Sequence, residues 1–307
     1  MIMESDVTST SVVLLTVPFV PTGKDDNQTQ QRGLSAVETF TQALGVAQEA
    51  APNSEILVVL EQKIKNERAT EGIEGVLKNQ PHCTVVSCDE FETVGRWYRG
   101  LRIAFSDEAT DKVLVIPGDI EKVENPSVFA EALKRMLAER SPSLLSVGDY
   151  TSTDKFKEEF DPRFAHPLLE MAFPAEWQII KAEGIRKVRS EYFCVGREVF
   201  AAFLRQGWRW LPLDATFLLM LAAASPSEQG LGIRKIDLGL VTDTPTRNVE
   251  SAVEQVVRFA FQTWFNSHVR DQDRDKDERK QLQRKLLAEF SCITNKAMAD
   301  LLTFVQD

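Results

Sequence analysis

The feature that most constrains the fold of this chain is an alternation of apolar runs and helical stretches between residues 12 and 150. Each apolar run has the length of a strand, and together they cover residues 12–20, 55–60, 83–88, 112–117 and 143–148. Strands that are apolar throughout are buried on both faces, and strands separated by helices belong to βα units that pair in parallel. Asn125 followed by Pro126 predicts the start of one such helix. The sequence therefore predicts an α/β fold, with a mainly parallel sheet flanked by helices.

After residue 150 the alternation breaks down, which predicts a mixed second half. Residues 149–164 are polar and rich in turn-forming residues, and we interpret residues 160–167, FDPRFAHP, as a flexible, lid-like loop that a substrate would order. The remaining pattern predicts a strand, a helix closed by Gly207, a second helix and a strand, over residues 191–196, 197–207, 215–224 and 234–241. We expect this half to supply the opposing wall of a site.

Residues 246–307 are predicted to be a C-terminal helical extension of a domain that covers residues 1–245. Apolar residues lie on one helical face over residues 252–264. Residues 270–285 mix basic and acidic side chains, which favours a solvated helix or linker over a partner or membrane-surface contact. Over residues 282–305 apolar residues recur near a heptad spacing. This last helix either packs on the core or forms a homo-oligomer.

Composition argues against several classes of protein. Acidic residues outnumber basic ones by 46 to 36, a formal net charge of -10, so a broad nucleic-acid-binding surface is not expected. The four cysteines lack metal-ligand spacing, and we interpret them as reduced core residues. The longest apolar run, residues 215–224, is roughly half the length of a membrane span, and the N-terminus lacks a signal-peptide pattern. We therefore expect a cytoplasmic protein without a membrane span.

Two acidic residues follow the fourth predicted strand, in the stretch VLVIPGDIE of residues 113–121. Ligands of open parallel sheets bind beyond the carboxyl ends of the strands, where Asp119 and Glu121 are expected. Residues at i and i+2 of an extended chain point the same way, so both carboxylates can face one small volume. Two such oxygen donors suit Mg²⁺ or Mn²⁺ bridging to a diphosphate, and Gly118 would let the backbone approach closely. The alternative is that a chain reaching the surface simply carries acidic residues.

The order of these pieces resembles the GT-A fold of nucleotide-sugar-dependent glycosyltransferases, over roughly residues 11–245. In that family a first strand ends in a proline-containing turn, here VPFVPTG with Pro18, and a second ends in an acid near the nucleobase, here Glu61. The resemblance implies that Asp119 and Glu121 hold a divalent ion and the diphosphate of the donor. The chain departs from the family where its second strand ends in one acid instead of two, and where its metal motif ends in Glu.

Two arginines and a further acid complete the candidate site. Arg96 and Arg99 lie on one side of a predicted helix, and the resemblance implies that they touch phosphate, to which guanidinium groups are suited. The alternative is a solvent-facing basic edge opposite Trp97. Asp214 stands at a probable helix start and would cap that helix. The resemblance implies that it is also the base that deprotonates the acceptor hydroxyl.

Together these features predict a hexosyltransferase-like glycosyltransferase that uses a nucleotide diphosphate sugar, Mg or Mn, and Asp214 as base. Two other classes are weighed against it. The first is a non-catalytic binding or scaffold protein with a GT-A-like fold. The second is a sugar-nucleotide nucleotidyltransferase, which normally needs a glycine-rich, basic first loop that residues 18–33 do not show. The donor sugar, the acceptor and the stereochemical outcome do not follow from the sequence.

Overall fold

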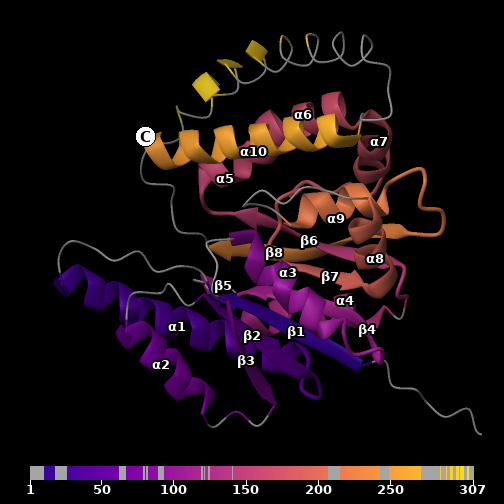
Figure 1. The fold of residues 1–307 in the computed structure, drawn as a ribbon. Helices are drawn as coiled ribbons and strands as arrows, with labels where there is room; N and C mark the ends of the chain where they lie inside the picture. Colours follow the sequence, from indigo (N-terminus) through magenta and orange to yellow (C-terminus); the bar gives the residue numbers. More distant parts are fainter. Residues whose placement is uncertain are drawn as a thin grey trace, which may run out of the picture.

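In the computed structural model a single mixed sheet lies between two layers of helices (Figure 1). The structure describes residues 10–17, 26–61, 67–78, 80, 82–88, 93–118, 120, 122–123, 125–139, 141–206, 215–242 and 249–270, with isolated residues beyond 283. The predicted α/β fold, with a mainly parallel sheet and a mixed second half, is confirmed.

The described strands form an eight-stranded sheet in the order β3-β2-β1-β4-β7-β6-β8-β5. Their bounds are β1 Thr10–Val17, β2 Glu55–Glu61, β3 Cys83–Cys88, β4 Thr110–Pro117, β5 Lys122–Val123, β6 Leu144–Ser152, β7 Phe193–Gly196 and β8 Gly232–Thr242. β7 runs antiparallel to both of its neighbours, and β5 runs antiparallel to β8. The other strands therefore all point in one direction, and we call the edge at which they end the carboxyl edge.

Helices cover both faces of the sheet because its strands are apolar on both sides. Successive residues of β4 alternate between two core clusters: Val113 and Val115 belong to one, and Leu114 and Ile116 to the other. The second cluster is covered by α1 (Asp26–Ala50), α2 (Glu67–Leu77) and α4 (Pro126–Ala138). The first is covered by α3 (Thr93–Ala104), α8 (Arg197–Arg205), α9 (Ala215–Ala223) and the helices described next.

Helix α4 begins as its sequence predicts. The side chain of Asn125 accepts a hydrogen bond of 3.2 Å from the backbone N–H of Val128, and Pro126 occupies the first turn, where no intrahelical N–H is needed. Asn125 follows β5 closely, so this cap fixes the direction in which the chain leaves the carboxyl edge.

The predicted lid-like loop over residues 160–167 is wrong, because this stretch is helical. The pieces α5 (Lys155–Phe160), η1 (Asp161–Ala165), α6 (His166–Ala172) and α7 (Pro174–Ala182) follow one another almost without a break. Pro162 and Pro167 suggested a loop, but each stands in the first turn of its piece, and η1 is a π-type turn. Phe160 and Phe164 are fully buried, so the packing of these rings offsets the cost of the interrupted hydrogen-bond ladder.

Helix α10 (Val249–Arg270) lies across α5 and α6 in Figure 1. Its buried apolar residues, Ala252, Val256, Phe259 and Ala260, belong to the same core cluster as Val113 of β4. The first helix of the predicted C-terminal extension therefore packs directly on the core of the sheet.

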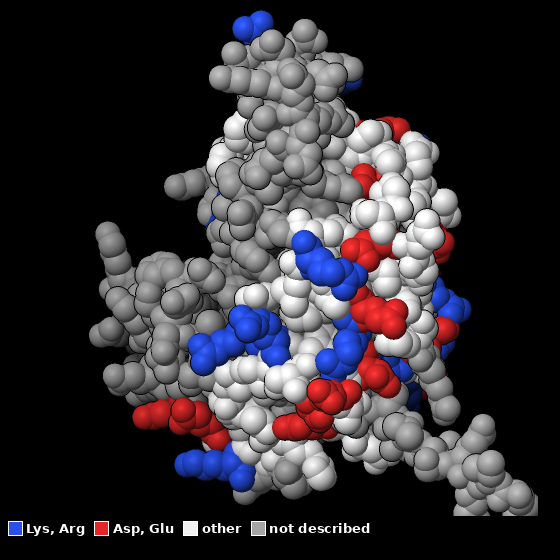
Figure 2. Space-filling view, turned by 45° about the vertical axis from the view of Figure 1, so that its right-hand side comes forward, with Lys and Arg blue, Asp and Glu red and all other residues white. Residues whose placement is uncertain are grey.

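The surface carries both signs of charge. On the face shown in Figure 2, described basic and acidic side chains lie interspersed. Within the described residues, none of the helices is both long enough and apolar enough to cross a bilayer. Cys83, Cys194 and Cys292 are free thiols, and burial raises the pKa of Cys194 to about 12.

Candidate functional site

The ends of three neighbouring strands show where the chain leads into the predicted donor-site residues. β1 ends at Val17, β2 at Glu61 and β4 at Pro117, and these strands are parallel neighbours. In the chain, Pro18 follows β1, Glu61 ends β2, and Asp119 and Glu121 follow β4. Outside the described residues lie Pro18, Asp119, Glu121 and Asp214, and also the side chains of Glu61 and Arg96. Their roles therefore stay predictions.

The described residues around the Asp-x-Glu motif are buried. Gly118 is buried at the end of β4, and Ile120, between the two acids, is 2% exposed within the core cluster beneath α1 and α4. A short connection then joins the end of β4 to β5, which pairs with the carboxyl end of β8 at Thr242. Both ends of this connection therefore lie at the carboxyl edge.

Helix α3 presents its predicted arginines unequally to this edge. It begins at Thr93, shortly after β3 ends, so its first turn is nearest to the carboxyl edge. Arg96 belongs to that turn, and Arg99, which is exposed, stands about one turn further away. Trp97 and Leu101 are buried on the opposite side, as the basic-edge alternative requires. The helix geometry thus agrees with both interpretations of Arg99.

A segment that sequence reasoning passed over also reaches this edge. Residues 184–192, which we call the α7–β7 connection, lead from α7 into the first residue of β7. The backbone N–H of Gly148 in β6 bonds to the carbonyl of Tyr192 at 2.8 Å. The Thr216 hydroxyl at the start of α9 donates to the carbonyl of Ser190. The connection therefore contacts the helix that Asp214 directly precedes in the chain.

The α7–β7 connection carries basic side chains that pair with acids of β6 and α5. Arg186 Nε donates to Asp149 Oδ2 at 3.2 Å, and Arg186 Nη1 lies 3.7 Å from Glu158 Oε1. Lys187 Nζ lies 2.7 Å from Glu158 Oε2, which also accepts from the Ser152 N–H at 2.8 Å. Burial raises the pKa of Glu158, but the bonds from Lys187 and Ser152 outweigh it and hold the pKa below its usual value.

Arg189 anchors the same connection to the helical layer. Its Nε lies 3.3 Å from Asp161 Oδ1, and its guanidinium lies 3.5 Å from the centre of the Phe160 ring. Its Nη1 donates to Gln255 of α10 at 3.4 Å. Complete burial raises the pKa of Asp161, although the charge of Arg189 opposes that shift. Arg189 is largely buried itself, which indicates a structural role.

His166 also has a structural position. Its Nε2 lies 2.8 Å from the carbonyl oxygen of Arg186, so in the neutral ring this nitrogen donates the proton. The ring packs against Trp177 at a tilt of 42°, with 4.8 Å between centroids. Burial lowers the pKa of His166, which favours the neutral ring. The histidine therefore fixes the backbone at Arg186.

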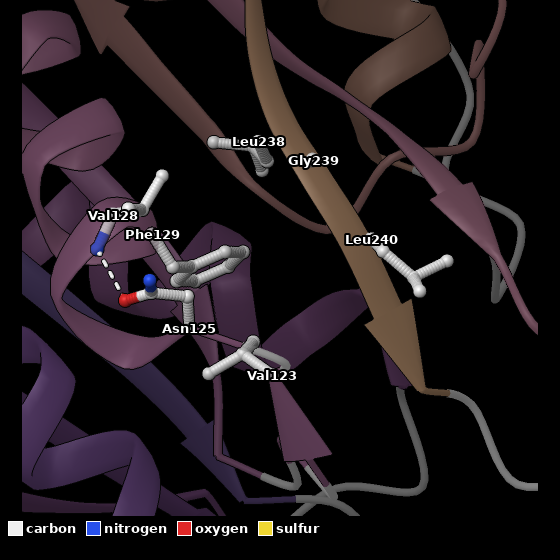
Figure 3. Close-up of a pocket in the computed structure, with 7 residues that line it drawn as sticks. All are labelled: Val123, Asn125, Val128, Phe129, Leu238, Gly239 and Leu240. Carbon is white, nitrogen blue, oxygen red and sulfur yellow. Dashed lines mark hydrogen bonds between the residues drawn. The ribbon is translucent and has the colours of Figure 1, made fainter.

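One hollow, of about 400 Å³, lies between α4 and the end of β8 (Figure 3). Its lining is mostly apolar, and consists of Val123, Asn125, Val128, Phe129, Leu238, Gly239 and Leu240. The amide oxygen of Asn125 is engaged in capping α4, and the lining has no charged side chain to hold a diphosphate. Within the described part of the chain, no three His, Cys, Asp or Glu side chains are grouped to hold a metal ion. The predicted metal ligands lie outside that part.

The sheet and its helices have counterparts among solved structures. The mannosyltransferase PcManGT from Pyrobaculum calidifontis, solved in complex with GDP-Man and Mn²⁺, matches with a TM-score of 0.51. The match covers 97% of this chain and 75% of that chain at 14% sequence identity. The chain has a GT-A-like glycosyltransferase fold. The fold expected from the resemblance to GT-A glycosyltransferases is thus confirmed.

Two further solved structures match with lower scores. Rv0371c from Mycobacterium tuberculosis H37Rv is 11% identical, with a TM-score of 0.39 over 81% of this chain and 97% of that one. A protein from Desulfovibrio desulfuricans G20, described as a nucleotide-diphospho-sugar transferase, is 11% identical, with a TM-score of 0.41 over 94% of this chain and 97% of its own. No protein-family profile matches the chain, and no curated protein matches it in sequence.

Proposed function

We propose that this GT-A-like chain is a hexosyltransferase-like enzyme that transfers a sugar from a nucleotide diphosphate sugar to a hydroxyl acceptor. The fold carries the proposal, because PcManGT shares it and was solved with GDP-Man and Mn²⁺. The register of the sheet agrees with it, since β1, β2 and β4 end side by side just before the predicted donor-site residues. In open parallel sheets, ligands bind beyond such strand ends.

Asp119 and Glu121 would hold Mg²⁺ or Mn²⁺ in this proposal. Their carboxylate oxygens are the donors that these ions prefer. The burial of Ile120 fits such a role, because in an extended chain the residues on either side of an inward-facing one point the other way. A bound ion would neutralise the charge that develops on the departing diphosphate.

The remaining donor contacts follow from the order of the strands. Pro18 and Glu61, after β1 and at the end of β2, would lie near the nucleobase and its sugar. Arg96 and Arg99 would hold phosphate oxygens. Because α3 begins near the carboxyl edge, we expect removal of Arg96 to weaken donor binding more than removal of the more distant Arg99.

Asp214 would act on the acceptor. Its carboxylate would take the proton of the acceptor hydroxyl while that oxygen bonds to the anomeric carbon and the bond to the diphosphate breaks. The contact of Thr216 with Ser190 supports this assignment, because it fixes the start of α9 against the α7–β7 connection. We place this activity in the cytoplasm, where free thiols such as the buried Cys194 persist.

Donor binding is the direct test. The purified protein is titrated with UDP-, GDP- and ADP-sugars, with and without Mn²⁺, while its melting temperature is followed. One donor should stabilise the chain in the presence of the ion. Asp119→Asn should abolish that stabilisation, and Asp107→Asn, which changes an exposed acid before the start of β4, should not.

Three outcomes bear on the proposal. If none of the donors stabilises the protein, the proposed function is wrong. If a donor binds equally well to Asp119→Asn and to the unaltered chain, the metal assignment is wrong. A chain that binds no donor but forms a concentration-dependent oligomer would be the non-catalytic scaffold instead.

A further inference from the structure

Two half-exposed cations converge on one buried carboxylate in the second half of the sheet. Arg186 Nε and Lys235 Nζ lie 3.2 and 3.7 Å from the same oxygen, Asp149 Oδ2. The side chain of Asp149 is 3% exposed, whereas those of Arg186 and Lys235 are 51% and 38% exposed. The buried acid therefore holds two cationic groups next to each other at the surface.

Several contacts hold Arg186 in place. The guanidinium of Arg186 is engaged through Nε and Nη1, its carbonyl is held by His166, and its Nη2 makes no hydrogen bond to the described residues. Lys235 Nζ lies beside Gly184, because a Cβ added at Gly184 would be 3.7 Å from that nitrogen. Gly184 has a φ of +68°, which other residues rarely adopt. A preorganised arginine loses little side-chain entropy when it binds an anion.

The ion pairs of this cluster contain one cation more than acids. Arg186, Lys187 and Lys235 pair with the carboxylates of Asp149 and Glu158. The exposed Asp237 stands in register with Asp149 and accepts a hydrogen bond from the N–H of Gly239. Asp149 Oδ1 is buried without a hydrogen-bond partner among the described residues, so the carboxylate uses one oxygen to orient both exposed cations. Lys187 is nearly buried and bonds to Glu158 and to the carbonyl of Lys157, which leaves Arg186 and Lys235 as the groups that a ligand can reach.

The register of the sheet places this cluster beyond β7, on the side of β4 that faces away from β1 and β2. Val115 of β4 pairs with Phe193 of β7, which pairs with Val147 of β6. Because β4 and β6 run in the same direction, Asp149 stands level with Pro117, the last residue before the Gly-Asp-x-Glu sequence. Two strand spacings, roughly 10 Å, separate them across the sheet. The cluster is therefore too far from β1 and β2 to serve the nucleotide, but near enough to serve a group beside the transferred sugar.

We propose that Arg186 and Lys235 form an anion subsite that binds a phosphomonoester group of the acceptor. Two adjacent cations match a doubly charged phosphate better than a single carboxylate, and the free edge of a guanidinium suits its oxygens. The acceptor role rests on the proposed glycosyl transfer, whereas the anion binding itself does not. The enzyme would accordingly prefer a phosphorylated hydroxyl compound over the same compound without its phosphate.

Calorimetric titration without donor or metal tests the subsite. The probes are glycerol 3-phosphate, glycerol and inorganic phosphate. We expect the two phosphates to bind and glycerol not to bind. Arg186→Gln should weaken phosphate binding at least tenfold and Lys235→Gln severalfold, while Arg186→Lys should retain part of it. Arg234→Gln is the matched control, because Arg234 is the exposed neighbour of Lys235 in β8 and pairs instead with Glu139.

Each result supports or overturns the subsite. Equal losses in Arg234→Gln and Lys235→Gln would show unspecific attraction to surface charge, and would overturn it. Competition between glycerol 3-phosphate and a nucleotide diphosphate would assign the site to the donor and would also overturn it. If Arg186→Gln does not fold, Lys235→Gln and Arg186→Lys still decide. Phosphate binding in a chain that binds no donor sugar would confirm the subsite and refute the proposed function separately.

Discussion

Phe259 packs α10 against the core of the sheet. Its ring is fully buried, and its centre lies 5.2, 5.8 and 6.2 Å from those of Phe217, Phe160 and Phe164. Replacing a buried Phe by Ala costs about 3–5 kcal/mol in lost burial and cavity formation. The three neighbouring rings belong to helices that already pack on other elements, so they can do little to fill the cavity. We therefore expect Phe259→Ala to lower the free energy of unfolding by about 4 kcal/mol.

Phe261 provides a matched control on the same helix. It stands two residues further along α10 and is 50% exposed. Since half of its surface already faces water, Phe261→Ala should cost less than about 1 kcal/mol. Urea unfolding, followed by tryptophan fluorescence and by circular dichroism, measures both variants. For a slope of about 3 kcal/mol per molar urea, Phe259→Ala should lower the midpoint by about 1 M or more, and Phe261→Ala much less.

The same experiment tests the predicted boundary at residue 245. If α10 unfolds together with the sheet, both probes will report one transition, and Phe259→Ala will shift all of it. If the C-terminal extension is an independent unit, unfolding will be biphasic and the variant will move only the smaller phase. Equal effects of Phe259→Ala and Phe261→Ala would refute the reasoning, because the burial of Phe259 would then contribute nothing.

Two further predictions concern a close backbone approach and a titrating ion pair. A Cβ at Gly196 would lie 2.1 Å from the carbonyl oxygen of Pro142, so Gly196→Ala should lower the melting temperature by many degrees. A Cβ at Gly45 would have nothing within 4 Å, so Gly45→Ala should leave the melting temperature unchanged or raise it. Similar melting temperatures of the two variants would contradict this. Glu158 has a lowered pKa in the folded state, so its pairing with Lys187 stabilises the protein above the unfolded pKa of about 4.5 and is lost as pH falls through the folded value. Thermal melts should therefore show Glu158→Gln less stable than the unaltered chain at pH 7, with the difference shrinking as the pH falls below about 4.5. A pH-independent difference would argue against this pairing.

The parallel half of the fold could be predicted because its physical signal is local. Strands buried on both faces must be apolar throughout, and helices between them must carry a cap and an apolar stripe, as Asn125 and Pro126 show for α4. The order of these strands then indicated the resemblance to the GT-A fold. What failed was the stretch from Phe160 to Pro167, because proline at the start of a helical piece and proline in a loop have the same local sequence.

The α7–β7 connection was missed for a different reason. Its basic residues in GIRKVRSE precede an apolar strand, and that is a signal which could have been noticed. Their partners, however, are distant in sequence: Asp149 is 37 residues from Arg186, and Asp161 is 28 residues from Arg189. Only the fold brings these charges together, so the sequence alone could not distinguish this connection from a solvated basic loop.

Two arginines of the α7–β7 connection have different roles. Arg189, buried against Phe160 and paired with Asp161, fixes the connection to the helical layer and, through Gln255, to α10. Arg186 is held just as firmly at Nε but keeps a solvent-facing edge. An ion pair whose cation is partly exposed to water contributes little to the stability of the protein. We therefore interpret the exposed edge of Arg186 as a group that binds a ligand and not as part of the scaffold. The anchoring by Arg189 explains how the connection can hold that ligand near the carboxyl edge.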